Sequence, residues 1–336
     1  MVLRKFARPI VAAALGTLLM ATLGIMVGSA SAKSDAAPVT VRVITATPTT
    51  AGIWDPTHKA AYAGVAKQNN WKLVIAETIP YGSAAQVLNR WGDEKVNVVI
   101  STDSGFSSSF VPAARKYPNT LWVLMGQPSG EWKDLKNFAA LTYDQCGFGF
   151  AQGVIAALLS RSHNVAYVGA IPILPALNVL KAAKYGASVA VPGTKVSVQY
   201  TGGFTDSQKS QEVASTLIAG GADVILALTN GGVSGSIAGR VQQLGKTYIG
   251  SYGDESKFAP KATVTSVAAN LSDAYGTIAQ QVASGTFKPG LFVTGIKQNG
   301  ILIYPFAPGN EATAAQVKSI MAKYVAGKYA VPNCST

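Results

Sequence analysis

Short apolar runs rich in β-branched residues alternate with longer segments of helical period in the first third of the chain. The apolar runs predict strands, which end at Gly, Pro or Ser residues. Predicted strands are 39–45, 71–77, 96–100 and 120–125. Predicted helices are 57–69, 83–91 and 106–117. This alternation indicates parallel βαβ units.

The same alternation starts again near residue 148 and continues to the end of the chain. Predicted helices are 148–159, 176–189, 208–219 and 234–244, and predicted strands are 164–169, 195–200, 223–228 and 247–251. Two further strands, 263–268 and 300–304, and two further helices, 271–284 and 312–326, indicate crossovers between two lobes. The predicted fold is therefore α/β, with two Rossmann-like lobes joined by crossover segments and a ligand cleft between them. The first lobe would hold 38–143 plus 269–287, and the second 144–268 plus 288–330.

In open α/β sheets ligands bind beyond the carboxyl ends of the strands, so the loops after the strands hold the candidate site residues. Polar or aromatic residues follow strand after strand at this edge. The candidates are Trp54, His58, Asp103, Gly105, Phe106, Asp144, Gln145, Phe204, Asn230, Tyr252, Asp254 and Asn270. Trp54 and Phe204 would face each other as an aromatic sandwich.

Each candidate also has a simpler structural interpretation. Trp54 would then pack on its own lobe, with Asp55 or Thr57 as the cap of the following helix. Asp103 or Ser104 would cap the next helix in the same way, and Asp144 and Asp206 would cap two helices of the second lobe. The sequence alone leaves both interpretations open.

The N-terminus has the layout of a secretory signal peptide over residues 1–32. Arg4, Lys5 and Arg8 precede the apolar stretch 10–27, and 30–32 reads Ala-Ser-Ala. The alternative is an uncleaved membrane anchor, because the apolar stretch approaches spanning length. Cleavage after Ala32 leaves 25 basic and 16 acidic residues, so the net charge falls from +12 to +9. No cysteine lies near the cut, so a lipid-anchored form is not expected.

The positive charge does not point to nucleic acid. Basic residues are scattered, and their longest run is the pair Arg115–Lys116. Catalysis has little support either, because the chain holds two histidines and no recognisable nucleophile-and-base motif. We therefore expect a protein that is not an enzyme, with no cofactor and no metal.

The two cysteines, Cys146 and Cys334, can form a bridge in an oxidising compartment. Such a bridge would pin the C-terminal tail to the body of the protein. The alternative is two unpaired thiols.

The loops resemble one family from about residue 39 to residue 306. Residues 200–206, Tyr-Thr-Gly-Gly-Phe-Thr-Asp, are similar to its Gly-Ser-aromatic-x-Asp turn, and 221–225 match its Gly-Ala-Asp-Val-Ile strand. Residues 249–255 resemble its Ile-Gly-x-x-x-Asp-Gln segment, 144–145 its Asp-Gln pair and 264–266 its Leu-Thr-Ser segment. Trp54 and His58 resemble its Trp-containing branch. The family is the basic membrane protein family of ABC transporter substrate-binding proteins, which includes the purine nucleoside receptor A lipoproteins.

The resemblance implies a type I periplasmic-binding-protein fold that closes on a purine nucleoside or base. It implies stacking by Trp54 and Phe204, a base end at Asp144 and Gln145, and a sugar end near Asn230 and Asp254. Two departures favour a free base or another planar heterocycle. Tyr252 stands where nucleoside receptors have an acid, and their lysine is missing at 268–270, which reads Ala-Ala-Asn.

The resemblance further implies an exported, monomeric receptor that delivers its ligand to a membrane permease driven by a partner ATPase. Two alternatives remain from the sequence. One is a sensory or signalling receptor of the same fold, and the other is a nucleoside-processing enzyme.

Overall fold

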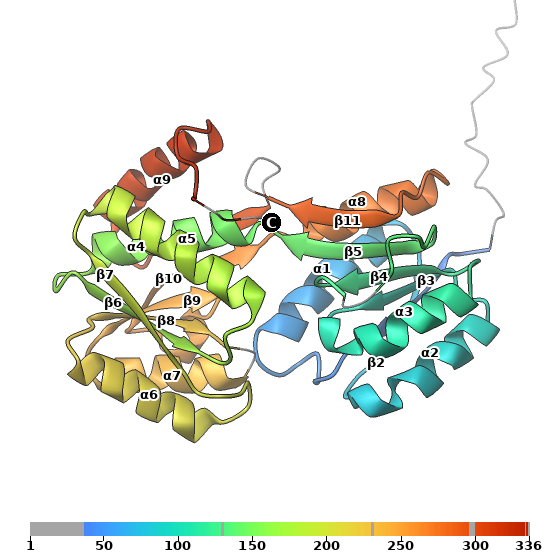
Figure 1. Ribbon diagram of the computed structural model, residues 1–336, viewed down its shortest axis with the longest axis horizontal. Helices are drawn as coiled ribbons and strands as arrows, with labels where there is room; N and C mark the ends of the chain where they lie inside the picture. Colours follow the sequence, from blue (N-terminus) through green and yellow to red (C-terminus); the bar gives the residue numbers. More distant parts are fainter. Residues whose placement is uncertain (1–36, 129–130, 230–231, 296–299, 333, 335–336) are drawn as a thin grey trace, which may run out of the picture. The chain divides into compact units, whose positions relative to one another are not determined.

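The computed structural model describes residues 37–334 except 129–130, 230–231, 296–299 and 333. Two six-stranded sheets form its framework, with helices on both faces of each (Figure 1). The first sheet has the order β11-β5-β4-β3-β1-β2, and the second has the order β12-β10-β9-β8-β6-β7. The predicted signal peptide and Asn230 lie outside the described residues.

All strands of the first sheet run parallel. They are β1 Thr40–Ile44, β2 Lys72–Ala76, β3 Val98–Ser101, β4 Leu121–Met125, β5 Phe138–Tyr143 and β11 Gly290–Thr294. The helices of this lobe are α1 Trp54–Gln68, α2 Ala84–Asp93, α3 Ser107–Lys116 and α8 Leu271–Ala283, with the 3₁₀ turns η1 Tyr81–Ser83 and η2 Ser104–Phe106.

The second sheet is parallel except for its edge strand β12, which pairs antiparallel with β10. Its strands are β6 Asn164–Gly169, β7 Lys195–Tyr200, β8 Val224–Leu228, β9 Thr247–Ser251, β10 Thr263–Ala269 and β12 Ile301–Ile303. Its helices are α4 Gln145–Leu159, α5 Leu174–Ala190, α6 Ser207–Ala219, α7 Gly232–Gln243 and α9 Glu311–Val325, with the 3₁₀ turn η3 Ser256–Phe258.

The predicted helices and strands are all present, but two strands were not expected. β5 is buried on both faces and reads Phe-Ala-Ala-Leu-Thr-Tyr, so it lacks the polar alternation that signals a strand. β11 pairs with β5 in the first sheet. The assignment of 288–294 to the second lobe is therefore wrong, and the first lobe keeps the chain up to Thr294.

The chain crosses between the lobes three times, as the predicted crossovers require. It passes from β5 to α4, from β10 to α8 and from β11 to β12. Backbone hydrogen bonds join the crossing segments, from Asp144 N to Thr294 O at 2.7 Å and from Asn270 N to Gly300 O at 2.7 Å. The crossings therefore form one hydrogen-bonded junction rather than three separate linkers.

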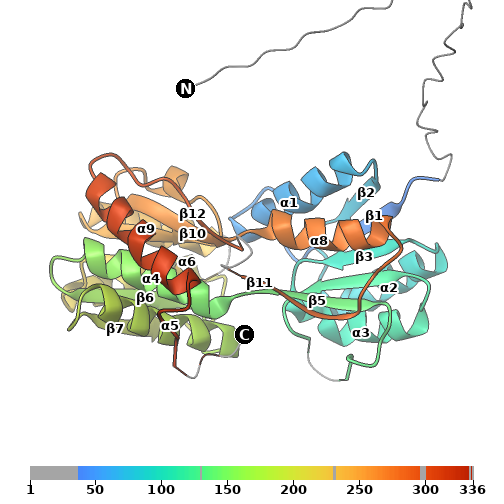
Figure 2. The ribbon, with the colours of Figure 1, turned by 90° about the horizontal axis from the view of Figure 1, so that it is seen from above.

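Helices from distant parts of the chain complete each lobe. α8 packs beside α1 on the first lobe, and α9 packs beside α4 on the second (Figure 2). α4 is buried along most of its length, and a side chain at Gly149 would strike the backbone of Val179 in α5. This close approach lets two helices share one face of the second sheet.

Cys146 and Cys334 form a disulfide bond with a Cα–Cα distance of 6.0 Å. Of the two alternatives that the sequence left open, the bridged form is therefore the one present. Tyr324 and Tyr329 also contact the ring of Phe150 in α4, at 4.5 and 5.8 Å between centroids. The bridge and the rings hold the C-terminal segment on the second lobe. Across the described ranges, no helix is long and apolar enough to span a membrane.

Candidate ligand-binding site

Trp54 begins α1 at the carboxyl edge of the first sheet. Its indole Nε1 donates to the Thr102 carbonyl at 2.9 Å, and its ring meets Tyr252 of the second lobe edge-on, with centroids 5.4 Å apart. Neither suggested cap is used, because Ile53 occupies the N-cap position without a side-chain bond. Trp54 is half-buried and lies where the two lobes touch.

His58 lies one turn further along α1 and is fully buried. Its Nδ1 lies 2.7 Å from the Tyr275 hydroxyl of α8, and its ring is 4.5 Å from that of Trp54. Burial lowers the pKa of His58 to about 3, so the imidazole is neutral at physiological pH. Nε2 has no hydrogen-bond partner in the described part of the chain, so it can bind a polar atom behind Trp54.

Asp103, Gly105 and Phe106 meet a residue that the sequence did not single out, Tyr81. Asp103 accepts hydrogen bonds from the Tyr81 hydroxyl and from Gly105 N at 2.7 Å. A Cβ on Gly105 would lie 2.5 Å from the Tyr81 ring, and Phe106 is buried in the core against that ring. These contacts match the structural interpretation of this loop, in which Asp103 caps a turn.

Asp144 and Asn270 cap the helices that begin at two of the crossings. Asp144 accepts from Gly147 N at 2.8 Å, and Asn270 accepts from Asp273 N at 3.3 Å. Burial raises the pKa of Asp144. Gln145 accepts from Asn178 Nδ2 at 3.0 Å. The two residues expected to bind the base, Asp144 and Gln145, therefore make hydrogen bonds within the protein beside a crossing between the lobes.

Tyr252 is the main side chain that the second lobe brings to the contact. Its ring stacks on Phe148 at 5.3 Å with an angle of 12°, and its phenol hydrogen-bonds with that of Tyr143. Its φ of +70° is unusual for a bulky residue and marks local strain. The next residue, Gly253, lies so close to α1 that a Cβ would stand 2.6 Å from both Ile53 and Thr57.

Phe204 does not form the expected sandwich with Trp54. Its side chain is 37% exposed in the turn after β7, and the second-lobe ring that contacts Trp54 is Tyr252. Asp206 caps α6 by accepting from Lys209 N at 2.8 Å, as the structural interpretation predicted. Asp254 is exposed and accepts from Ser256 N at 3.0 Å.

Glu255 is a functional candidate that sequence reasoning missed. It is fully buried below the Tyr252 turn, where Oε2 accepts from the Tyr248 hydroxyl at 2.6 Å. Burial raises its pKa to about 7. An acidic residue after a glycine-flanked turn was the only signal, and it does not distinguish Glu255 from its exposed neighbour Asp254.

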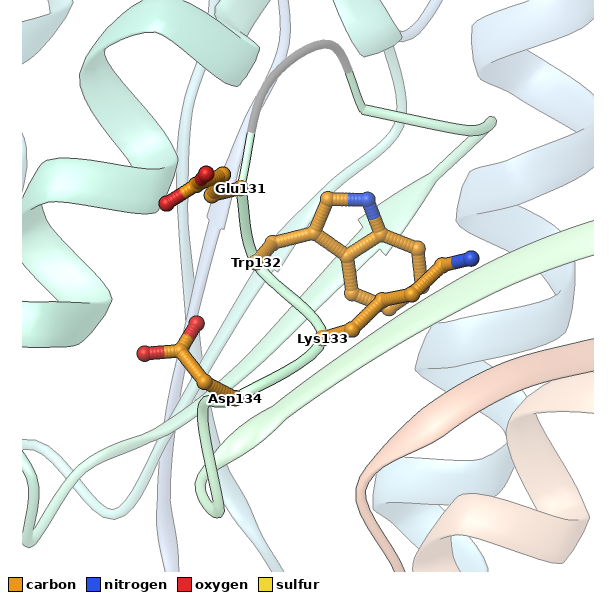
Figure 3. Close-up of a pocket in the computed structure, with 4 residues that line it drawn as sticks. All are labelled: Glu131, Trp132, Lys133 and Asp134. Atoms are coloured by element: carbon orange, nitrogen blue, oxygen red, sulfur yellow. The ribbon is translucent and has the colours of Figure 1, made fainter.

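A surface hollow of about 320 Å³ lies elsewhere, on the loop between β4 and β5 (Figure 3). Glu131, Trp132, Lys133 and Asp134 line it. Trp132 is buried against Phe138 at the amino end of β5, and Asp134 pairs with Arg115 at 2.5 Å. This hollow is therefore separate from the edge where Trp54 and Tyr252 meet. The described part of the chain has no group of three or more His, Cys, Asp or Glu side chains able to hold a metal ion.

Comparison with known proteins gives a consistent result. The family model for PnrA-like ABC transporter substrate-binding proteins matches residues 54–334. A purine-binding protein of Brucella abortus is 27% identical over 229 residues, which are 66% of this chain and 63% of that protein. The match thus spans less than two thirds of the Brucella protein. A nucleoside-binding ABC transporter protein of Lactococcus lactis, BmpA, is 24% identical over 66% of this chain and 67% of its own.

Solved structures confirm the predicted type I periplasmic-binding-protein fold. The solute-binding protein of an ABC transporter system from Conexibacter woesei superposes with a TM-score of 0.73 at 22% identity. The superposition covers 89% of this chain and 100% of that one. At this identity the likeness concerns the fold.

Proposed function

Since the chain belongs to the family of PnrA-like ABC transporter substrate-binding proteins, we propose that it binds a purine base, a nucleoside or a similar planar heterocycle between its lobes. The observation that carries the proposal is Trp54, a half-buried aromatic ring held at the contact between the lobes. Aromatic side chains give planar rings a large apolar contact at low cost in conformational entropy. The printed names of the Brucella and Lactococcus relatives support the same class of ligand.

The ligand ring inserts beside Trp54, and Tyr252 gives way or forms the opposite wall. The His58 ring lies 4.5 Å from the Trp54 ring, and its Nε2 has no hydrogen-bond partner within the described residues. This atom hydrogen-bonds the edge of the ligand. Phe204 and Asp254, both exposed, close over the ligand from the second lobe. Asn230 is expected to contribute from the loop after β8.

A free base fits better than a nucleoside. Tyr252, which meets Trp54, is itself packed against Phe148 and Tyr143, so this edge of the second lobe offers flat aromatic faces to a ligand. The oxygens of Asp144 and Asn270 already accept hydrogen bonds from helix N-termini. A ribose would therefore find few unpaired partners.

The protein acts as an exported, monomeric receptor without enzymatic activity. Ligand contacts to both lobes favour the closed form, which docks on a membrane permease driven by its ATPase. The predicted signal peptide, cleaved near Ala32, accounts for export. The alternative of a signalling receptor differs in the partner and not in the ligand site.

A thermal-shift screen tests the ligand class. Adenine, guanine, hypoxanthine, adenosine and inosine are compared with sugars and amino acids at equal concentration. A ligand of the folded state raises the melting temperature by mass action. A rise with at least one purine supports the proposal, and a rise with a sugar or amino acid alone overturns it.

A further inference from the structure

Asp55 is a buried carboxylate that neither caps α1 nor pairs with a cation among the described residues. It is 5% exposed, one position after Trp54 in the first turn of α1. The charged groups that face it are Asp103 and Glu77, both acidic, and burial raises its pKa. Burying a carboxylate in such surroundings costs stability unless its oxygens are hydrogen-bonded, so the partners of the two Asp55 oxygens matter.

Both oxygens of Asp55 accept hydrogen bonds from loops at the carboxyl edge of the first sheet. Oδ1 accepts from Thr102 Oγ1 at 2.7 Å, and Oδ2 accepts from the Thr47 hydroxyl. Thr47 belongs to the loop after β1, and Thr102 is the first residue after β3. A carboxylate can accept two hydroxyl donors at once, whereas an amide of the same shape has only one acceptor atom.

Thr102 also holds the Trp54 ring. Its carbonyl accepts the indole N–H at 2.9 Å, while its hydroxyl is bound by Asp55. Trp54 and Asp55 are neighbours in the chain, so the three residues form a closed ring of one peptide bond and two hydrogen bonds. The peptide unit that carries this carbonyl is also held by Asp103 N, which donates to Ser101 Oγ at 3.2 Å, so the Asp55 bond to the Thr102 hydroxyl is one of two contacts that hold the loop after β3.

We propose that Asp55 is a positioning residue for the ligand, acting through Thr102 to fix the plane of the Trp54 indole. The proposal rests on the proposed function in that Trp54 is taken as the stacking wall. Without Asp55 the Thr102 hydroxyl loses its acceptor, the loop after β3 is held by the Ser101–Asp103 bond alone, and the geometry of the indole bond to the Thr102 carbonyl is no longer fixed. The ring then presents the ligand with several orientations instead of one.

The test uses two pairs of variants in the full mature chain. Asp55→Asn keeps the shape and removes one acceptor, and Thr102→Val removes the hydroxyl but keeps the carbonyl. Thr102→Ser retains the hydroxyl and is the rescue variant. Asp223→Asn is the matched control, because Asp223 also binds a hydroxyl, Ser160 Oγ at 2.5 Å, and loop amides, but at the amino end of β8.

Two readouts are recorded. The first is the indole N–H signal of Trp54 in a ¹⁵N-correlated spectrum without ligand, identified among five tryptophans by its loss in Trp54→Phe. The second is the Kd for adenine by calorimetry. Asp55→Asn and Thr102→Val should shift the Trp54 signal alone and weaken adenine binding about tenfold, the size of one lost charged hydrogen bond. Thr102→Ser and Asp223→Asn should leave both readouts as in the wild type.

The outcomes separate this proposal from the proposed function. If wild-type protein binds adenine but Asp55→Asn and Thr102→Val change neither readout, Asp55 is not a positioning residue and the function stands. If wild-type protein binds no purine, the proposed function fails, and the indole signal still decides whether Asp55 fixes Trp54. If Asp55→Asn does not fold, the Val and Ser variants of Thr102 carry the test.

Discussion

The two lobes share a strand order, yet they hold their facing edges by different means. In the first lobe, hydrogen bonds between loops fix the edge through Asp55, Thr102 and the Trp54 indole. In the second lobe, stacked rings fix it, with Tyr252 lying on Phe148. The first lobe thus presents an aromatic ring whose orientation is set by hydrogen bonds, and the second presents a stacked ring with a strained backbone at Tyr252. The difference suggests that the first lobe orients the ligand and the second adapts to it.

Each lobe also buries a titratable side chain beside its facing edge. Glu255 is buried under the Tyr252 turn and His58 under Trp54, and burial favours the neutral form of each. His58 therefore lowers the stability of the first lobe as the pH falls below about 6.5, and Glu255 lowers that of the second lobe as the pH rises through 7. Asp55 in the first lobe acts in the same direction as Glu255, because burial also raises its pKa.

Removal of the disulfide should destabilise the second lobe most. The bridge joins residues 188 apart in the chain, and both lie on the second lobe. Cys334→Ser should lower the free energy of unfolding by about 3–5 kcal/mol, because the unfolded chain gains freedom. Hydrogen exchange should rise in α4 and α9 and remain unchanged in β1 and β3. Equal loss of protection in both lobes would contradict the assignment of the bridge to one lobe.

Glu255→Gln should change the pH dependence of stability. The pKa of Glu255 is raised to about 7 in the folded protein, so its contribution is fully present below about pH 4.5 and is lost as pH rises through 7. The variant should therefore gain about 3 kcal/mol relative to the wild type between pH 4.5 and 8. Urea unfolding at several pH values measures this difference. Glu212→Gln, at an exposed site, is the control, and parallel curves for wild type and Glu255→Gln would contradict the prediction.

Gly253→Ala should weaken the contact between the lobes. The added Cβ would stand 2.6 Å from Ile53 and Thr57, so the Tyr252 turn must move away from α1. We expect a cost of about 1–3 kcal/mol, typical of overpacking, and a larger radius of gyration in X-ray scattering without ligand. Gly239→Ala is the matched control, because a Cβ at this α7 position meets no atom within 4 Å. An unchanged radius in Gly253→Ala would show that the turn does not hold the lobes together.

Trp54→Ala should weaken ligand binding more than it changes stability. Loss of one stacked aromatic costs roughly 1–3 kcal/mol of binding free energy. Phe204→Ala should cost less if Tyr252 is the wall opposite Trp54, and more if Phe204 closes on the ligand as the resemblance implied. Calorimetric titration of both variants with the same purine decides between the two rings. No loss in Trp54→Ala would return Trp54 to a purely structural role.

The sequence was sufficient for the fold because βαβ alternation needs only local periodicity. Of the two strands that it did not predict, β5 is buried on both faces and lacks alternation, and β11 joins the first sheet from a distant part of the chain. Their place depends on tertiary pairing. The same holds for the lobe boundary, which lies after Thr294 because β11 pairs with β5.

The site was predicted in part. Trp54 and Tyr252 were among the candidates because both lie in loops after strands, and the structure brings their rings together at 5.4 Å. Asp103 could not be judged, because its partner Tyr81 lies 22 residues away and no spacing links the two. Local spacing makes Asp55 a candidate helix cap, whereas in the structure its carboxylate accepts from Thr47 and Thr102 in two other loops. The hydrogen-bond partners of such residues depend on how all the loops at the carboxyl edge of the sheet are placed, which local sequence does not determine.

Titration of the mature protein with adenine and adenosine, with glucose and leucine as comparisons, distinguishes a receptor for planar heterocycles from one for sugars or amino acids. We expect one adenine bound per chain, weaker binding of adenosine, and no heat from glucose or leucine. Binding of glucose or leucine without any response to the purines would contradict it.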